Sequence, residues 1–512
     1  MSELKSRSLS VILTLVLLLT MILSACSGNK SNNDSSSTSS SSSGSTASSG
    51  SSAASSGGEG GSSSLAGKKI EMSILGIGGW VPSQLSVEMS PAFAEYAKEK
   101  YGYDVTFTFE EAPFSSLFQK AAASLSTKSQ EFNIIISDSQ WLGAFAEPGW
   151  IVSVNEIMQQ EPELANIEWF DPVVQKAYMT YPDGTDQLWG FPQEGDVLVL
   201  YVRKDMLSDP TEQANFKAKY GFDLPQTFED FEQLTIDKFL KMAEFFTRPE
   251  QDLYGTAVQY SKEYDYFTGS FYPHIWSSGG EIWDPVSGDV YGVLNTENNA
   301  KALETFVSIR NYMPPGAENY GIAQVTEAFT QGKLFSAYHW AAVGAAMITP
   351  ELQDKVMVVP IPGYEVNGEI KRISSIGGQP WVINKFNDED HMRVAIDFLK
   401  WWYLPETQLE FAKRGGNPTT KAALESPDFD SIQPWFRAYR YSLTESRARD
   451  FWHHPKYSEL LSIQQEEFTS YLTGGRSSAA ETLEVIACKQ QQIMYDAGTT
   501  KNAPPAACAN IR

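Results

Sequence analysis

The first third of the globular part of the chain alternates between strand-like and helix-like patterns. Residues 70–75 and 103–109 alternate apolar and polar side chains, and 132–138 contains a continuous apolar run. These runs predict strands, the last of them covered on both faces. Helical patterns lie between them at 91–101 and 118–125. This strand–helix order predicts parallel pairing in an α/β layer, in which ligands lie beyond the carboxyl ends of the strands.

The rest of the chain combines extended runs with longer helical patterns. Strand-like segments are predicted at 187–192, 196–201, 334–339, 356–361 and 381–384. Helices are predicted at 228–246, 301–312, 323–330 and 391–403, and over most of the C-terminal third. Trp401 and Trp402 are adjacent on one of these helices, so we expect at most one of them to face the core.

The N-terminus has the pattern of an export signal. Lys5 and Arg7 precede an apolar run over 9–23, and small residues follow it before Cys26. The run is shorter than the roughly 20 residues of a membrane-spanning helix. Its end, Leu-Ser-Ala-Cys, resembles a bacterial lipobox, which implies a signal peptide over 1–25 and a lipidated Cys26 as the first mature residue. The alternative is an ordinary cleaved signal with a coincidental cysteine.

A low-complexity segment follows the cysteine. Residues 27–64 are nearly all Ser, Gly, Ala, Asn and Thr. Such a composition buries too little apolar surface to offset the entropy of ordering, so 26–64 is predicted to be a disordered tether. Flexible-coil scaling gives it a typical reach of about 30–35 Å.

Composition and charge narrow the class of protein. The residues from 65 onward exceed what one hydrophobic core usually serves, so two domains are expected. The 13 Trp, 23 Tyr and 28 Phe residues suffice for large cores and leave aromatic rings for a binding surface. The formal net charge of −24 argues against nucleic acid and against a membrane surface bound through basic patches. It favours solubility outside the cell.

Two cysteines remain near the C-terminus. In an oxidising compartment the simplest interpretation of Cys488 and Cys508 is one disulfide, worth about 3 kcal/mol in the chain-entropy model. It would pin the tail over 499–505 against the last helix, within a C-terminal segment at 488–512. Two thiols and five scattered histidines show no metal-ligand spacing, so neither a metal nor a cofactor is expected.

Seven local patterns occur together in a fixed order along the chain. They include Ile136-Ser137-Asp138-Ser139-Gln140-Trp141, a Trp-x-x-Gly-Gly segment at Trp276, and Gly377-Gly378-Gln379-Pro380. The patterns lie at 114–149, 188–205, 275–281, 332–340, 377–384, 395–402 and 416–419. In this order they resemble family 1 of the extracellular solute-binding proteins, the sugar-binding components of ABC importers. The resemblance covers 70–487 and leaves out the tether and the tail.

The resemblance implies an α/β fold of two lobes, of the type II periplasmic-binding-protein kind. Each lobe is then a sheet flanked by helices, and crossover strands hinge the lobes so that they close on a ligand. Lobe one is expected at 68–190 plus 362–414, and lobe two at 191–361 plus 415–500. The chain is long for the family, so insertions such as 205–224 are expected to decorate the lobes.

Candidate site residues follow the chemistry of carbohydrates, which present apolar C–H faces and a rim of hydroxyl groups. Trp80 follows a glycine-rich strand end; the alternative is core packing. Asp138 and Gln140 end a buried strand; the alternative is helix capping. Asp196 interrupts the apolar crossover, where the family often has an acid that faces the ligand.

The resemblance adds residues from the second half of the chain. Trp276 and Trp340 resemble the stacking aromatics of the second lobe, with core packing as the alternative. Gly378 and Trp381 follow the Gly-Gly loop of the family, with a simple turn as the alternative. Arg414 either donates to ligand hydroxyls or is a solvated hinge charge.

Three classes of function are open to this chain: enzyme, adhesin or sensor partner, and transport receptor. A glycosidase needs two carboxylates placed about 5–10 Å apart across the scissile bond, and the chain shows no nucleophile elbow, zinc-protease or phosphate-loop motif. A surface adhesin or sensor partner with the same fold is a second alternative. We expect a monomeric, non-enzymatic receptor, lipid-anchored on the extracellular face of a bacterial membrane. It would capture a sugar, in our prediction an oligosaccharide, for an ABC permease; polyols and sugar phosphates are the alternative ligands.

Overall fold

The computed structural model describes residues 65–511, so the predicted signal peptide and the whole tether at 26–64, Cys26 included, lie outside the described residues. The first sheet has the strand order β2-β1-β3-β11-β4. Its strands are β1 (Lys69–Ile77), β2 (Asp104–Ala112), β3 (Ile134–Ile136), β4 (Phe191–Pro192) and β11 (Pro380–Ile383). The predicted parallel pairing is confirmed, because β1 pairs parallel with both β2 and β3. β11 returns from far along the chain and pairs antiparallel with β3.

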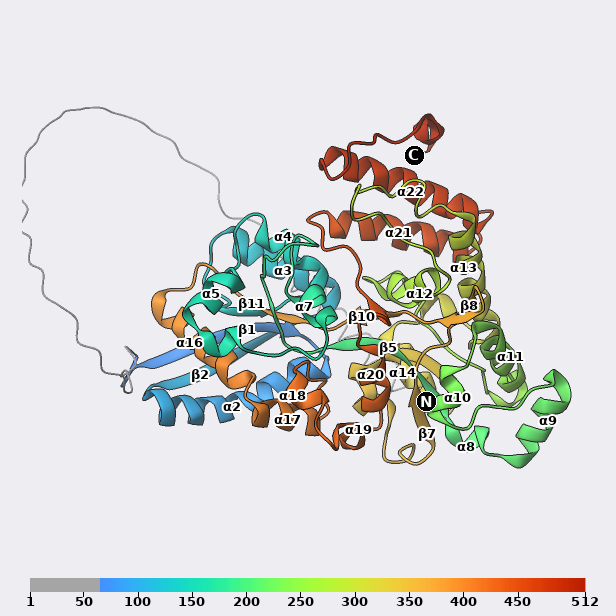
Figure 1. Cartoon of the computed structure of the whole chain (residues 1–512), viewed down its shortest axis with the longest axis horizontal. Helices are drawn as coiled ribbons and strands as arrows, with labels where there is room; N and C mark the ends of the chain where they lie inside the picture. The colour runs from blue at the N-terminus through green and yellow to red at the C-terminus, as the bar shows by residue number, and fades with distance from the viewer. Residues whose placement is uncertain (1–64, 512) are drawn as a thin grey trace, which may run out of the picture. The chain divides into compact units, whose positions relative to one another are not determined.

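Helices lie around this sheet, with α2 and α16 side by side along it (Figure 1). Rings of Phe93 in α2, Phe398 in α16 and Trp381 in β11 pack edge to face at 5.3–5.4 Å, so the three elements share one aromatic core. The helices of this part are α2 (Val81–Tyr101), α3 (Phe114–Ser126), α4 (Leu142–Ala146), α5 (Val154–Gln160), α6 (Pro162–Ala165), α7 (Pro172–Tyr178), α16 (Glu389–Trp402), α17 (Pro405–Lys413) and α18 (Lys421–Leu424).

Helix α2 begins ten residues before the predicted start at Pro91. Proline often marks the first turn of a helix, but here Pro82 has that place and Pro91 lies in the interior. Proline cannot donate to the carbonyl four residues earlier, which belongs to Val87. The Ser90 hydroxyl donates to that carbonyl instead, at 2.8 Å. The lost backbone bond is thereby replaced, and the helix continues to Tyr101.

The expectation for the adjacent tryptophans at the end of α16 was wrong. Trp401 and Trp402 are both buried, with 6% and 0% exposure. The Trp401 ring contacts Phe93 of α2, whereas the Trp402 ring contacts Phe411 of α17. Because helices cover α16 on two sides, two neighbouring positions both reach a core.

The second sheet has the order β12-β10-β5-β6, and β7 also pairs with β5. Its strands are β5 (Asp196–Arg203), β6 (Ser336–Trp340), β7 (Val356–Val359), β10 (Ser374–Gly377) and β12 (Ala448–Arg449), and β8 (Tyr364–Val366) and β9 (Glu369–Lys371) form a separate hairpin. Its helices are α8 (Lys204–Leu207), α9 (Pro210–Tyr220), α10 (Phe228–Glu232), α11 (Ile236–Phe246), α12 (Tyr266–Ser277), α13 (Glu297–Ser308), α14 (Ile322–Thr330), α15 (Gly344–Met347), α19 (Phe429–Ile432), α20 (Phe436–Ser442), α21 (Tyr457–Leu472) and α22 (Ala479–Asp496).

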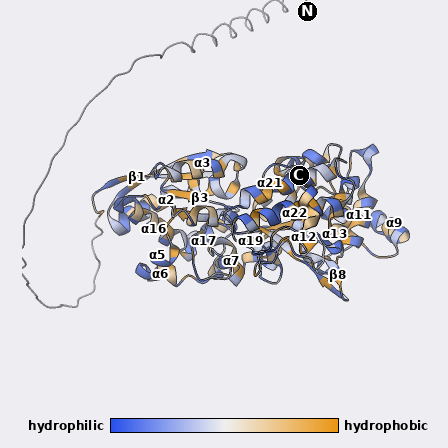
Figure 2. Ribbon diagram, turned by 90° about the horizontal axis from the view of Figure 1, so that it is seen from above, coloured by the Kyte–Doolittle hydropathy of each residue, from blue (hydrophilic) through white to orange (hydrophobic). Residues whose placement is uncertain are grey.

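Apolar and polar residues occur together in the surface helices (Figure 2), as expected for helices with one face against a core. The helix predicted at 228–246 is divided into α10 and α11, because the backbone of Leu234 and Ile236 bonds to Gly363 instead. Within residues 65–511, no helix is both long enough and apolar enough to cross a membrane.

The chain crosses between the two sheets in short segments near β4, β5, β10 and β11. One crossing leads from β4 of the first sheet to β5 of the second. Another lies between Gly377 and Pro380, because β10 belongs to the second sheet and β11 to the first. The strands between 364 and 377 belong to the separate hairpin and to the second sheet, whereas the sequence places the lobe boundary at 362. Near the other expected boundary, Thr420 forms a bridge with Trp169, so α18 lies with the first sheet.

The predicted disulfide is confirmed. Cys488 in α22 bonds to Cys508, with 5.4 Å between their Cα atoms. The tail is also anchored at Asp289, whose carboxylate accepts from Thr500, Gln491 and Asn502 at 2.5–2.9 Å. The tail thus lies against both the last helix and a loop of the second-sheet region.

Loss of the disulfide should free the tail more than it disturbs the rest of the fold. We expect Cys508→Ser to speed hydrogen exchange at backbone amides of 497–511, because a closed loop of about 20 residues contributes roughly 3 kcal/mol. Amides of β1 should be unchanged. Chemical reduction of the unmodified protein should reproduce the effect, and unchanged exchange at the tail would contradict the assigned role.

Candidate functional site

A cavity of about 290 Å³ lies among segments that follow strands of both sheets. Six of the nine predicted binding residues line it: Trp80, Asp138, Gln140, Asp196, Trp340 and Gly378. Gly78 and Trp80 follow β1, Phe114 follows β2, and Asp138 follows β3, so the first sheet contributes the carboxyl ends of its parallel strands. This is the edge at which open α/β sheets bind ligands.

Four helices begin at this cavity. The first residues of α3, α12 and α14, and Trp80 at the N-cap of α2, are all in its lining. The N-terminus of a helix has free N–H groups and a partial positive charge. Oxygen atoms, whether from acidic side chains or from a ligand, are therefore favoured here.

Trp80 is fixed by its indole nitrogen. Nε1 donates to Glu194 Oε1 at 2.6 Å and to Gln379 Oε1 at 2.9 Å, while the ring remains half-buried at the cavity. Burial raises the pKa of Glu194 well above its usual value, and the nearby charge of Asp196 raises it further. Both partners lie on the segments that cross between the sheets, so the position of the ring depends on those crossings.

Trp340 ends β6 and lies against the crossing at Gly377 and Gly378. A Cβ atom at Gly377 would come within 2.9 Å of the Trp340 ring. Gly378 has φ +91°, and a Cβ atom there would lie 2.8 Å from the Asp196 nitrogen. Only glycine combines this conformation with so close an approach. The two glycines therefore allow the indole, the crossing and Asp196 to meet at one wall of the cavity.

Asp196 is a buried acid at the start of β5. Its Oδ1 accepts from the backbone nitrogens of Val197 at 2.8 Å and Ala342 at 3.0 Å. Burial raises the pKa of Asp196 to about 8 against these two hydrogen bonds, and burial likewise raises the pKa of Asp265 to about 7. Burial thus favours the protonated form of both groups, and a protonated carboxyl group can both donate to and accept from hydroxyl groups.

Asp138 links the two halves of the site. Its Oδ1 caps the Ser139 nitrogen at 2.8 Å, and its Oδ2 accepts from the Tyr264 hydroxyl at 2.6 Å. Burial raises the pKa of Asp138 well above its usual value, and the nearby Asp265 adds to this, whereas the Tyr264 bond opposes it. Tyr264 has φ +45° and its ring packs 4.5 Å from that of Phe114. Such a conformation is strained for a bulky residue, so these contacts hold Tyr264 across the site.

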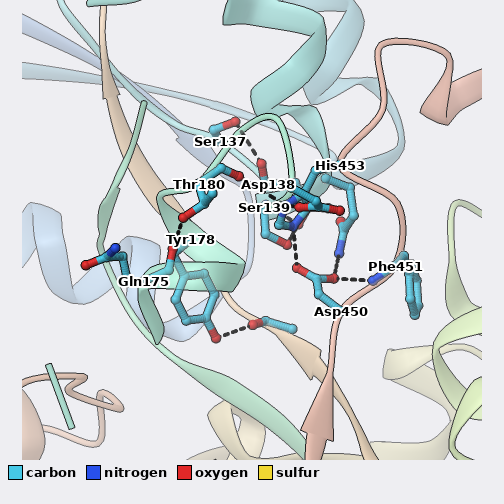
Figure 3. A network of polar contacts seen from close by, with 12 residues as sticks. Ser137, Asp138, Ser139, Gln175, Tyr178, Thr180, Asp450, Phe451 and His453 are labelled. Carbon is cyan, nitrogen blue, oxygen red and sulfur yellow. Dashed lines mark hydrogen bonds and ion pairs between the residues drawn. The ribbon is translucent and has the colours of Figure 1, made fainter. Parts of the chain in front are cut away.

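Gln140 makes a second link of the same kind. Its Nε2 donates to Asp450 Oδ1 at 2.6 Å, while its buried Oε1 has no hydrogen-bond partner. Asp450 also pairs with His453 at 3.1 Å (Figure 3). His453 in turn pairs with Asp183 at 2.9 Å. Burial alone would lower the pKa of His453, but the two carboxylates outweigh it and raise the pKa well above the usual value.

The lining suits binding rather than metal coordination. Among residues 65–511, no group of three or more His, Cys, Asp or Glu side chains is arranged to hold a metal ion. The cavity is surrounded by aromatic rings and by polar groups, some or all of whose hydrogen bonds are made within the protein. Its volume is at the lower end of the usual range for ligand sites, about 300–1,000 Å³.

The model of a family described as bacterial extracellular solute-binding protein matches residues 82–409, which is more than half of the chain. The chain belongs to this family. It is accordingly a binding protein and not an enzyme, as the resemblance predicted.

Three solved structures show the same fold. One from Agrobacterium radiobacter K84, in complex with ribitol, is 20% identical with a TM-score of 0.66, and the match covers 84% of this chain and 99% of that one. Maltose-bound MalE3 of T. maritima is 18% identical with a TM-score of 0.65, covering 83% and 100%. The GacH receptor of Streptomyces glaucescens is 16% identical with a TM-score of 0.64, covering 84% and 98%. The predicted type II periplasmic-binding-protein-like fold is confirmed.

Three predicted residues of this solute-binding protein do not line the cavity. Trp381 is fully buried between Phe398 and Trp402, because the strand after the glycine loop turns its side chain into the core. Arg414 ends α17 and pairs with Glu410 at 2.8 Å. Trp276 lies at the opposite end of α12 from the cavity and lines a different one.

Other lining residues escaped prediction. Phe114, Glu263, Asp265 and Tyr266 line the cavity, yet only Phe114 lay within a segment that resembled the family. The signal for Asp265 and Tyr266 is an acid and an aromatic residue at the start of an apolar helix. An alternation of Tyr and acidic residues over 263–266 reads equally well as a solvated loop.

The raised pKa of Asp196 makes stability depend on pH. Between its usual value of 3.8 and about 8, the folded protein keeps a proton that the unfolded chain has lost. The contribution of Asp196 to stability is therefore full at low pH and falls as pH rises through this window. The stability of Asp196→Asn should lack this dependence on pH. Relative to the unmodified protein, its free energy of unfolding should therefore rise by up to about 1.4 kcal/mol per pH unit across the window. Thermal unfolding midpoints between pH 5 and 8 measure the difference.

Asp354→Asn is the matched control, since Asp354 is exposed on a loop. It should follow the unmodified protein at every pH. Parallel curves for Asp196→Asn and the unmodified protein would show that Asp196 is charged in the fold throughout this range.

Proposed function

We propose that this protein captures a neutral sugar in the cavity and delivers it to the permease of an ABC importer. Family membership supports a solute-binding role. The similar solved structures support a polyhydroxylated ligand, since their bound molecules include ribitol, maltose and acarbose. An oligosaccharide is our first choice, with polyols as the alternative.

The observation that carries this proposal is the meeting of indole rings and carboxyl or amide groups at one cavity. Trp80 and Trp340 offer apolar faces to sugar C–H groups, while Asp138, Gln140 and Asp196 lie within the same lining. The unpartnered, buried Oε1 of Gln140 is an acceptor that a ligand hydroxyl would satisfy. A buried acceptor without a partner costs about 1–3 kcal/mol, which ligand binding would recover.

The charge of the lining favours a neutral ligand over a sugar phosphate. In the described part of the chain, the cavity lining includes four acidic residues and neither Lys nor Arg. A phosphate would meet repulsion from whichever of these groups is ionised, without a cation to pair with it. Protonated carboxyl groups serve hydroxyl groups equally well as donors and acceptors.

Two hydrogen bonds would report closure of the lobes in this proposal. Tyr264–Asp138 and Gln140–Asp450 each join a segment after β3 to a segment of the second-sheet region. Opening along the crossings would break both, and a bound sugar would favour the closed form by its greater affinity for it. Lobes at 68–190 plus 362–414 and 191–361 plus 415–500, adjusted at the crossings, and a monomeric state belong to the same proposal.

A sugar screen tests this function. Neutral mono- and oligosaccharides, polyols and sugar phosphates are compared by thermal shift, and a neutral sugar at 100 times its dissociation constant should add about 2.7 kcal/mol to stability. Trp80→Ala should weaken binding of that sugar about tenfold, because it removes a half-buried stacking face. Calorimetric titration of both proteins measures the loss.

Trp169→Ala is the matched control. Its indole is also half-buried, but it packs against Tyr403 away from the cavity, at 5.3 Å. It should keep the affinity of the unmodified protein. The cavity assignment fails if Trp80→Ala binds as tightly as this control, and the proposed function fails if no neutral sugar or polyol produces a shift.

Membrane attachment through Cys26 is a separate part of the proposal, supported by the sequence from the apolar run to the Ser/Gly-rich segment. Cys26→Ala should release the protein from the membrane fraction into the medium, because the lipid can be attached only through a thioether bond to the sulfur of Cys26. Fractionation and labelling with a radioactive fatty acid measure this. Cys508→Ser should remain membrane-bound and labelled; equal labelling of Cys26→Ala would exclude a lipid on Cys26.

A further inference from the structure

The Gln140 amide in the lining of the first cavity is one end of a row of polar groups that leads away from it. Its Nε2 donates to Asp450 Oδ1 at 2.6 Å, and Asp450 Oδ2 lies 3.1 Å from His453 Nε2. The other ring nitrogen of His453, Nδ1, lies 2.9 Å from Asp183 Oδ1 and 3.2 Å from the Thr180 carbonyl oxygen. The row thus connects a segment after β3, a segment after β12 and the loop after α7.

His453 has an oxygen acceptor at each of its two ring nitrogens. A neutral imidazole has one N–H group and one lone pair, so in either tautomer the lone pair would face an oxygen atom. The imidazolium has two N–H groups and donates to both sides. Burial lowers the pKa of His453, but the charges of Asp183 and Asp450 outweigh burial and raise this pKa well above its usual value. Geometry and charge therefore agree on the imidazolium.

Asp450 is an acceptor in three hydrogen bonds. It accepts from Gln140 and His453 and, at 2.7 Å, from the backbone nitrogen of Phe451. The orientation of an amide follows from the hydrogen bonds around it. Because an acceptor faces Nε2 of Gln140, Oε1 remains the unpartnered atom of a side chain that lines the first cavity. A proton on Asp450 would let the amide turn over and offer Nε2 to a ligand instead.

The surroundings of this row supply no second cation to Asp450. Asp450 and His453 line a second cavity of about 800 Å³. The other charged residues of its lining are Asp183, the ion pairs Lys176–Glu445 at 2.7 Å and Arg449–Glu281 at 2.6 Å, and Asp284. Towards the first cavity lie Asp138 and Asp265, whose pKa values are raised by burial and, in addition, by the charge of Asp450. His453 is therefore the cation that balances Asp450.

We propose that His453 is a positioning residue for ligand recognition. Its imidazolium keeps Asp450 an acceptor, Asp450 fixes the amide of Gln140, and Oε1 of that amide then requires a hydroxyl donor from the ligand. When His453 loses its proton at high pH, the orientation of the amide is no longer fixed, and affinity falls. This inference rests on the proposed function and names one determinant of its specificity.

The test is a double-mutant cycle between His453 and Gln140, with ribitol, maltose and maltotriose as probes in calorimetric titrations near neutral pH. His453→Leu should weaken binding about tenfold, because the acceptor at Gln140 is no longer held toward the ligand. Gln140→Leu should weaken binding at least as much. Addition of His453→Leu to Gln140→Leu should cost nothing further, since His453 acts through Gln140.

A pH profile separates this role from a merely structural one. The affinity ratio of the unmodified protein to Gln140→Leu should stay constant through pH 6.5, the usual pKa of histidine, and fall at higher pH. Asp196 and Asp265 titrate in both proteins, so the ratio isolates His453. His453→Lys keeps a cation, and the second cavity gives the longer side chain room. It should retain more affinity than His453→Leu.

His391→Gln is the matched control. His391 also pairs with an acid, Asp388 at 2.8 Å, but lines neither cavity, so the variant should keep the affinity of the unmodified protein. Additive losses in the cycle, or an affinity ratio that does not change with pH, overturn the inference while the proposed function stands. If His453→Leu does not fold, the affinity ratio decides alone. Failure of all three probes to bind also overturns the inference; the wider sugar screen decides the proposed function separately.

Discussion

The close approach of three backbone segments at the crossing between the sheets is the constraint on which the site depends. Gly377 and Gly378 pass so near Asp196, Tyr178 and Trp340 that side chains at these positions would overlap them. The Tyr178 hydroxyl fastens this contact by donating to the Gly377 carbonyl at 2.6 Å and accepting from the Asp196 nitrogen at 3.1 Å. Because the crossings carry Glu194 and Gln379 as well, one packed junction positions both indoles and the central acid.

This junction concentrates acidic groups that would repel one another if all were ionised. Burial raises the pKa values of Asp138, Glu194, Asp196 and Asp265, so their charge is reduced rather than paired with cations. The negative charge that remains is stabilised by the partial positive charge at the N-termini of the four helices that begin at the cavity. The cavity lined by Trp276 differs, since four of its five acids form ion pairs with Lys176, Arg449 and His453. Neither solution leaves a free cation for an anionic ligand in these linings.

The sequence predicted the fold better than the site, for identifiable reasons. Parallel strands and their helices leave periodic patterns, so β1, β2 and β3 were found close to their bounds. Asp138 was placed at the cavity because an acid at the end of a buried strand has no core role, and Asp196 because it interrupts the apolar crossover where the family often has an acid. Trp381 was placed there wrongly, since one position along a strand decides whether a side chain faces the cavity or the core. The start of α2 was missed because Ser90 replaces a bond that Pro91 removes, a compensation that only the structure reveals.

The same reasoning explains why the second cavity, which Trp276 lines, could not be predicted from the sequence. Residues of the first cavity lie next to glycine-rich turns and strand ends, which are local signals. The second cavity is assembled from α7, the 281–293 loop and the segment after β12, which are distant in sequence and lack a common motif. What joins the two cavities is Asp450, which accepts from Gln140 on one side and pairs with His453 on the other. Asp450 therefore lies in the wall between the two cavities and bonds to residues on both sides of it.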